Sequence, residues 1–145
     1  MGNENAVVQP YLFFAGRCQE ALDFYCSTIG AQVEMVMRFD QSPDPMPEGV
    51  LQPGFENKIM HSAFRVGCTT ILASDGCNDD AGFKGFSLAL CVPTIAEADR
   101  VFAGLVEGGQ VQMALAKTFW SPRYGMLTDR FGISWMVMVP AEPAR

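Results

Sequence analysis

The sequence predicts an α+β fold in which two βαβββ modules place their curled, mixed sheets around a shared cup. The main observation is a repeat: GAQVEM at residues 30–35 recurs as GGQVQM at residues 108–113, an offset of 78 residues. Each copy reads strand, helix, glycine and strand. Since neither half can bury both faces of its sheet alone, we expect the halves to pack by pseudo-twofold symmetry. Two further pairs keep the same offset without a gap, Phe24 with Phe102 and Leu12 with Leu90.

The bulk properties indicate a globular domain. The 145 residues suit one domain of two half-size modules, and 49% of them are apolar, which is enough for a core. The formal net charge is −6, with 10 Lys and Arg side chains against 16 Asp and Glu. Nucleic acid and anionic membrane surfaces attract basic proteins, so neither is an expected partner. No apolar run is long enough to cross a bilayer.

The cysteines indicate a reducing compartment. There are five, an odd number, and no two form a CxxC pair. The first six residues are polar and lack the apolar core of a secretory signal. We therefore expect a cytoplasmic protein whose reduced cysteines act as small buried hydrophobic residues rather than as metal ligands. They are Cys18, Cys26, Cys68, Cys77 and Cys91.

The first module, residues 8–75, begins with an aromatic, apolar run at 9–14 that predicts a buried strand. A helix is expected at 18–29, where apolar side chains recur at i, i+3 and i+7. Gly30 ends this helix, because the residue after a helix often needs a positive φ. A strand follows at 32–39.

A long loop, 40–58, leads to a hairpin that completes the first module. Four prolines and two glycines exclude regular structure from the loop. Loops of this length in compact domains are often lids or binding loops, and we expect this one to cover a ligand. The hairpin is predicted from strands at 59–66 and 69–74, with its turn at Gly67-Cys68.

The second module, residues 85–139, follows a linker at 75–85 and begins with a strand at 86–92. Thr94 and Glu97 form a capping-box pattern, which predicts a helix that ends at residue 107. The remaining strands are expected at 110–115, 119–128 and 134–139. The last two strands form a hairpin around residues 129–132, where Asp129 and Arg130 are expected to shape the turn rather than to do chemistry.

Paired modules of this size resemble the vicinal-oxygen-chelate superfamily, which includes glyoxalase I, bleomycin resistance proteins and dihydroxybiphenyl dioxygenase. More narrowly, four stretches are similar to its PhnB-like branch, described as 3-demethylubiquinone-9 3-methyltransferase-like. The similarity covers nearly all of residues 8–139 and implies the glyoxalase/bleomycin resistance fold and a homodimer. The stretches are PYLFF at 10–14, EALDFY at 20–25, KIMHS at 58–62 and YGMLTDRFGISW at 124–135.

The methyltransferase activity in that description is not expected here. S-adenosylmethionine is usually held by a glycine-rich turn after the first strand of a doubly wound sheet. The sequence predicts neither that turn nor that sheet.

Metal-dependent members of the superfamily place His, Glu or Gln ligands on the first and fourth strands of each module, where they bind divalent ions such as zinc or manganese. In the first module, the first-strand position falls near Pro10, with Gln9 beside it as a possible ligand. The fourth-strand position falls at Leu72 or Ala73, and no carboxylate occurs before Asp75.

The second module offers no better ligands at these positions. They fall at Ser87 and at Met136, where catalytic members often carry Glu. A site without charged ligands would not retain a metal ion, so we predict no metal at the usual site and no other cofactor.

His61 is the only histidine of the chain. It could be a general base or a hydrogen-bond donor inside the cup, because histidine changes charge near neutral pH. It could equally be a strand histidine bonded to a neighbouring backbone group or acid. The resemblance favours a functional role, since a histidine after the Lys-Ile-Met run recurs in this branch.

Four further residues are candidates for ligand binding. Trp120 could form an aromatic wall at the rim of the cup, whereas Trp135 on the last strand is expected to pack in the core. Arg123 could bind a carboxylate or phosphate in bidentate fashion, or could form a surface ion pair. Tyr11 and Tyr124 complete the set, which lies in the stretches that resemble the family or beside them.

Nine methionines, mostly on predicted strands, could line the cup for an apolar ligand of variable shape or could simply fill the core. We therefore predict a metal-free protein that binds a small apolar or aromatic molecule. The alternative is a divalent-metal-dependent lyase, isomerase or dioxygenase of the glyoxalase kind, with a displaced site that uses Gln9, His61 or Asp75. DNA binding is the poorest of the three hypotheses because the chain is acidic. The two modules could pair within one chain or be exchanged between two chains.

Overall fold

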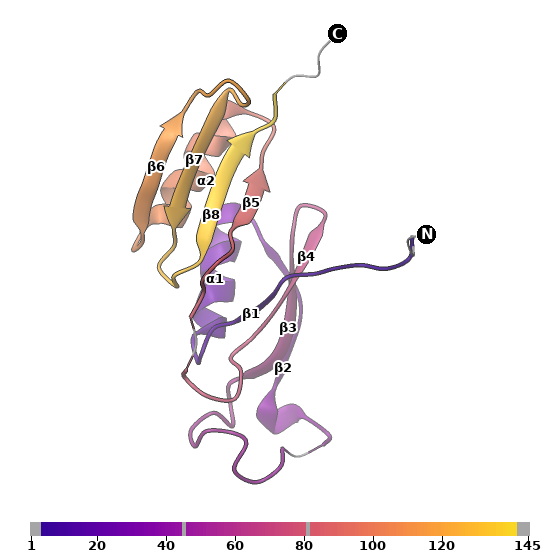
Figure 1. The fold of residues 1–145 in the computed structure, drawn as a ribbon. Coiled ribbons are helices and arrows are strands. Elements are labelled where there is room, and N and C mark those ends of the chain that lie inside the picture. Colours follow the sequence, from indigo (N-terminus) through magenta and orange to yellow (C-terminus); the bar gives the residue numbers. More distant parts are fainter. Residues whose placement is uncertain (1–3, 45, 81, 142–145) are drawn as a thin grey trace. The chain divides into compact units, whose positions relative to one another are not determined.

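The computed structural model describes residues 4–44, 46–80 and 82–141. Over these residues the chain forms two α-helices and eight strands, which make two four-stranded mixed sheets (Figure 1). The chain divides into two compact units, residues 1–81 and 82–145, each with one helix and one sheet. The predicted α+β class with two βαβββ modules is confirmed, and the shared cup stays a prediction.

The sheet of the first unit has the strand order β1-β4-β3-β2. β1 runs parallel to β4, and the other neighbouring strands are antiparallel. The helix and the hairpin have the bounds that the sequence predicts, because Gly30 at φ 69° ends α1 and Gly67 at φ 58° turns the hairpin. The elements are β1 (Tyr11–Phe13), α1 (Cys18–Ile29), β2 (Gln32–Arg38), the 3-10 turn η1 (Phe39–Gln41), β3 (Ile59–Val66) and β4 (Thr69–Ser74).

The second unit repeats this topology, with the strand order β5-β8-β7-β6 and a parallel β5–β8 pair. The Thr94 hydroxyl accepts the Glu97 amide at 3.1 Å and so caps α2 as the sequence predicts. The second half of the predicted capping box does not form, because the Glu97 carboxylate pairs with Arg100 rather than with the Thr94 amide. The elements are β5 (Leu88–Cys91), α2 (Ile95–Val106), β6 (Gln110–Ala116), β7 (Arg123–Thr128) and β8 (Ser134–Val139).

Each helix covers one face of the sheet in its own unit. In the first unit the Tyr25 ring of α1 stacks on Phe64 of β3, with ring centroids 5.8 Å apart. In the second unit Phe102 of α2 comes so close to Gly125 of β7 that a Cβ there would lie 3.0 Å from the phenyl ring. We call the face that the unit's own helix leaves uncovered the open face of each sheet.

Three predicted strands begin later than expected. β1 begins at Tyr11 rather than at residue 9, β5 begins at Leu88 rather than at residue 86, and β7 begins at Arg123 rather than at residue 119. Before β7 the chain turns, because the Ser121 amide donates to the Thr118 hydroxyl while the Thr118 amide donates to the Ser121 carbonyl. Pro122 has no N–H to donate to a strand ladder, so regular pairing starts after it.

A steric constraint explains why the second copy of the repeat has glycine at its second position, residue 109. Gly109 occupies the place of Ala31 in the first copy. A Cβ at Gly109 would lie 2.0 Å from the carbonyl oxygen of Thr128. At Gly108 the atom closest to such a Cβ is 3.2 Å away. The close approach of β6 and β7 therefore requires glycine at residue 109, and the two copies of the repeat differ for that reason.

Among the described residues no helix is both long and apolar enough to span a membrane.

Candidate functional site

The open face of the first sheet carries a cluster of aromatic and methionine side chains. Side chains alternate between the two faces of a strand, so the residues opposite the helix-covered Leu12, Phe64 and Ile71 share the open face. The strand register places Met35 beside Ala63, Ala63 beside Leu72, and Leu72 beside Tyr11. The residues of this cluster are Tyr11, Phe13, Met35, Met37, His61, Ala63 and Leu72.

Three rings lie side by side in this cluster. The centroids of Tyr11 and Phe13 are 4.9 Å apart, and those of Tyr11 and His61 are 5.7 Å apart, both pairs tilted. Tyr11 is 38% exposed and Phe13 is 50% exposed, which is unusual for rings on a strand of a folded domain. The first sheet therefore presents an aromatic surface that its own helix does not cover.

His61 and Tyr11, both candidates from the sequence, are joined by a hydrogen bond. Tyr11 Oη lies 3.1 Å from His61 Nδ1. Among the described residues, the hydrogen-bond partner of the His61 imidazole is thus a phenol from another strand, and neither a backbone group nor an acid. The bond fixes the orientation of the imidazole on the open face, and it engages only one of the two ring nitrogens.

A polar group lies at one end of this open face, and sequence reasoning missed it. Arg65 of β3 donates to Gln32 and, at 3.5 Å, to Glu34, both on β2. Thr70 of β4 donates to Glu34 at 3.3 Å. The sequence could have indicated this group, because Gln32 and Glu34 alternate with the apolar residues of β2, but the pairing with β3 depends on register.

The open face of the second sheet is rich in methionine. Met113, Met126 and Met136 are direct partners across three neighbouring strands. Tyr124 and Met138 form the next pair along β7 and β8. Most of these side chains are half-buried. For this sheet, methionines that line a ligand-accessible surface therefore fit better than methionines that fill a closed core.

Trp120 and Tyr124, two of the candidates from the sequence, are in contact. Their ring centroids are 5.4 Å apart in an edge-to-face arrangement, and Phe119 packs on Trp120 at 4.7 Å. Trp120 is 47% exposed, whereas Trp135 is buried in the core as predicted. The Trp135 indole donates to Asp129, whose other carboxylate oxygen accepts the amides of Phe131 and Ile133. The expected turn role of Asp129 is confirmed.

Arg123 forms an ion pair. Its guanidinium donates to both carboxylate oxygens of Asp99 on α2, at 2.9 and 3.0 Å. These hydrogen bonds and the charge of Asp99 raise the pKa of Arg123. Arg123 pairs with Val139 in register and so points to the opposite face from Tyr124. Of the two interpretations from the sequence, the structure shows the ion pair.

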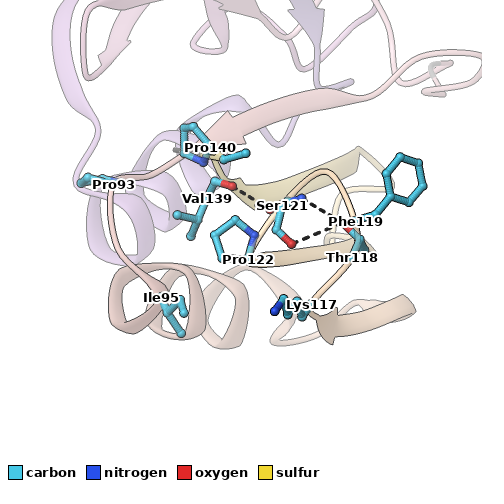
Figure 2. Close-up of a pocket in the computed structure, with 10 residues that line it drawn as sticks. Pro93, Ile95, Lys117, Thr118, Phe119, Ser121, Pro122, Val139 and Pro140 are labelled. Atoms are coloured by element: carbon cyan, nitrogen blue, oxygen red, sulfur yellow. Dashed lines mark hydrogen bonds between the residues drawn. The ribbon is translucent and has the colours of Figure 1, made fainter. Parts of the chain in front are cut away.

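A depression of about 480 Å³ on the second unit escaped sequence reasoning (Figure 2). The Ser121 hydroxyl, which lines the depression, donates to the Val139 carbonyl at 2.6 Å, so this hydroxyl already has a hydrogen-bond partner. Lys117 lies at its edge. Neither Trp120 nor Tyr124 lines it. The lining residues are Pro93, Ile95, Lys117, Thr118, Phe119, Ser121, Pro122, Val139, Pro140 and Ala141.

The long loop of the first unit is anchored at several points. Phe55 is buried, the Gln52 amide donates to the Cys77 carbonyl at 2.7 Å, and the Asp40 amide donates to the Glu56 carbonyl at 2.9 Å. The loop also forms a depression of about 360 Å³ together with η1. Of its four prolines, Pro45 lies outside the described residues. That the loop covers a ligand stays a prediction.

The residues at the usual metal positions do not fit a divalent ion. Asp75 is buried, and its two oxygens accept the amides of Cys18 and Ile59 at 2.7 Å each. Ser87 bonds to Ser134 at 2.6 Å. Gln9 is exposed and lies outside β1. Throughout residues 4–44, 46–80 and 82–141, no group of three or more His, Cys, Asp or Glu side chains is placed to hold a metal ion.

The cysteines differ in environment. Cys18 is fully buried, and burial raises the pKa of its thiol to about 12. Its sulfur lies 3.8 Å from the Ser62 hydroxyl. Cys26, Cys68 and Cys91 are exposed. The expectation that the cysteines are buried is therefore wrong for these three, because they lie on the outer side of α1, at a hairpin tip and on an open face.

Known proteins resemble this chain along almost its whole length. The family described as 3-demethylubiquinone-9 3-methyltransferase matches residues 6–138. Protein YjdN of Escherichia coli K12 is 33% identical over 140 residues, which cover 91% of this chain and 94% of YjdN.

Solved structures agree with this match. Protein PA1353 of Pseudomonas aeruginosa is 40% identical, with a TM-score of 0.81 over 94% of this chain and 98% of its own. The PhnB protein of Bacillus cereus is 25% identical, with a TM-score of 0.75 over 92% of this chain and 99% of its own. Proteins of the glyoxalase/bleomycin resistance/dioxygenase superfamily share the fold at 14% and 18% identity.

Proposed function

Because the chain belongs to the 3-demethylubiquinone-9 3-methyltransferase family, the PhnB-like branch with the glyoxalase fold, we propose that it is a metal-free protein that binds a small apolar or aromatic molecule. The open face of the first sheet is the proposed site, and the methionine-rich open face of the second sheet is a second surface of the same character. The family description names a methyl transfer, which is not part of the proposal.

The exposed ring cluster of Tyr11, Phe13 and His61 is the observation that carries this proposal. Exposing aromatic rings to water is unfavourable in free energy, and covering them with a ligand is favourable. Met37 pairs with His61 in register and Met35 pairs with Ala63, and flexible thioethers adapt to ligands of different shape. Covering about 100 Å² of this apolar surface would contribute roughly 2.5 kcal/mol to binding.

The residues at the usual metal positions support a metal-free site. An enzyme of the glyoxalase kind needs oxygen and nitrogen ligands that converge on one ion. Asp75 would have to leave two backbone amides to become a ligand, and an unpaired buried amide costs about 1–3 kcal/mol. Use of this carboxylate as a ligand in a displaced metal site would therefore destabilise the folded protein.

The turn between β1 and α1 does not favour the methyl transfer either. It contains a single glycine, Gly16, and leads from a strand of a four-stranded mixed sheet. A doubly wound sheet with a glycine-rich turn is the usual support for S-adenosylmethionine.

A homodimer in the cytoplasm is part of the proposal. Val111 and Met113 on the edge strand β6 and Phe119 beside it are exposed apolar residues, and such surfaces often mark contacts between subunits. Sedimentation equilibrium of the untagged protein tests this state, and a single species of monomer mass at 0.1 mM or so would contradict it.

Binding of the neutral fluorophore N-phenyl-1-naphthylamine tests the proposed function. Its emission rises in apolar surroundings, so a titration gives a Kd. Phe13→Gln places a polar amide in the ring cluster and is expected to weaken binding about tenfold. Phe86→Gln is the matched control, because Phe86 is 43% exposed and lies in the second unit, outside the cluster.

The same titration is repeated after dialysis against EDTA and then with zinc, nickel, manganese or ferrous ions added. The proposal expects one Kd throughout. A catalytic turnover that depends on one of these ions would contradict it and would favour the metal-dependent alternative.

A further inference from the structure

We propose that the ligand of the first open face carries a hydrogen-bond acceptor, a carbonyl-type oxygen on a flat ring, that binds Nε2–H of His61. This inference rests on the proposed function and adds the chemical class of the ligand. It depends on which nitrogen of the imidazole Tyr11 occupies.

Tyr11 engages Nδ1 and leaves Nε2 for the ligand. The distance from Tyr11 Oη to His61 Nδ1 is 3.1 Å, within the range of a hydrogen bond. Within the described residues, the imidazole has no other hydrogen bond. His61 is half-buried, and its ring lies on the open face against Tyr11, whose ring in turn contacts Phe13. A molecule that covers these rings therefore also contacts the imidazole, whose Nε2 has no hydrogen-bond partner among the described residues.

Three arrangements of protons are possible on this pair. If the Tyr11 hydroxyl donates to Nδ1, the neutral imidazole carries its proton on Nε2. If the imidazole is cationic, both nitrogens carry a proton, and Nδ1–H donates to the phenol oxygen. Only in the third arrangement, a neutral ring with Nδ1–H donating to Tyr11, is Nε2 an acceptor.

The chemistry of the phenol disfavours the third arrangement. A phenol oxygen is a weaker acceptor than an imidazole nitrogen, because its lone pair is delocalised into the ring. The phenol hydroxyl is also a stronger donor than the imidazole N–H. The bond from O–H to Nδ1 is therefore the stronger of the two neutral choices, and Nε2 is a donor in both favoured arrangements. An N–H donor within an apolar surface selects ligands that place an acceptor there. A ligand without an acceptor would bury the Nε2–H group without a hydrogen-bond partner, which is unfavourable.

The tautomer is measurable because His61 is the only histidine of the chain. Long-range ¹H–¹⁵N correlation spectra of untagged, histidine-labelled protein contain one imidazole, so no assignment is needed. For the neutral imidazole, the proposal expects the proton on Nε2. Tyr11→Phe keeps the ring and removes the hydroxyl, and is expected to give a mixture of tautomers. A wild-type spectrum with the proton on Nδ1 would overturn the inference.

The ligand class is tested with two isosteric probes, 2-acetylnaphthalene and 2-isopropenylnaphthalene, which differ only in C=O against C=CH₂. The wild-type protein is expected to bind the ketone about fivefold more tightly, the effect of one net hydrogen bond. His61→Phe keeps a flat ring without N–H. It is expected to give equal affinities for the two probes.

The outcomes separate this inference from the proposed function. Equal affinity of the wild-type protein for the two probes would overturn the acceptor class and leave apolar binding at the face in place. Loss of the preference in Phe86→Gln as well as in His61→Phe would place the probes elsewhere and overturn the inference. Failure of both probes to bind would overturn the proposed function and the inference with it.

Discussion

The carboxylate of Asp75 accepts the backbone amide of Cys18 at 2.7 Å, across 57 residues of sequence. Its second oxygen accepts the amide of Ile59, also at 2.7 Å. One buried side chain at the end of β4 therefore ties together the first turn of α1 and the start of β3. Negative charge at a helix start also interacts favourably with the helix dipole.

Replacing Asp75 by Asn is expected to destabilise the protein by about 2–3 kcal/mol, because the amide group meets one of the two backbone N–H donors with an N–H of its own. Urea unfolding followed by circular dichroism measures the change. Asp79→Asn is the control, since Asp79 is exposed, and it is expected to be nearly neutral. Equal stability of Asp75→Asn and the wild type would show that these two hydrogen bonds contribute little.

The buried thiol of Cys18 is expected to make the protein less stable in alkaline solution. Desolvation raises its pKa from 9.0 to about 12, so the folded state keeps this proton at a pH where the unfolded state loses it. The stabilisation is therefore complete below pH 9 and falls as the pH rises from about 9 towards 12. Urea unfolding at pH 8, 9 and 10 should show a steeper fall for the wild type than for Cys18→Ala. Parallel curves would mean that another group controls the alkaline limb.

Local signals explain why the sequence predicted much of the fold. The bounds of α1 and of the β3–β4 hairpin follow from Gly30 and Gly67, whose positive φ values end one element and turn the other. The start of β7 could not be read in the same way. Besides Pro122, it depends on the Ser121 hydroxyl, which donates to Val139 on another strand, and such a bond leaves no local pattern.

Only two residues of the candidate site were predicted from the sequence as site residues, and their contact was not predicted. Tyr11 and His61 were both named from the sequence, yet they meet only because β4 lies between β1 and β3. Strand order is a long-range property, and hydrophobic alternation gives the face of a residue without its neighbours. For the same reason the Arg65 group was missed, and the pairing of Arg123 with Asp99 stayed one of two possibilities.

Replacing Gly109 by Ala is expected to cost more than about 2 kcal/mol, because the new Cβ would overlap the Thr128 carbonyl and the backbone of β7 would have to move. Thermal unfolding measures the loss. Gly82→Ala is a suitable control, since a Cβ there meets no atom within 4 Å, and it should leave the melting temperature almost unchanged. If both variants melt together with the wild type, the approach of β6 to β7 is looser than the structure shows.

Divalent metal ions are expected to leave the stability of the protein unchanged. A ligand that binds only the folded state at a hundredfold its Kd adds about 2.7 kcal/mol, so a retained metal would raise the melting temperature by several degrees. Freshly purified, untagged protein should contain no stoichiometric zinc, nickel, manganese or iron by elemental analysis, and adding each ion should not shift the transition.

The exposed thiols can bind zinc weakly, so Cys26→Ser/Cys68→Ser/Cys91→Ser serves as the reference protein. A stabilisation that persists in this variant and is lost in Asp75→Asn or His61→Phe would establish a displaced metal site built on those side chains. That result would favour an enzyme of the glyoxalase kind over a metal-free binding protein.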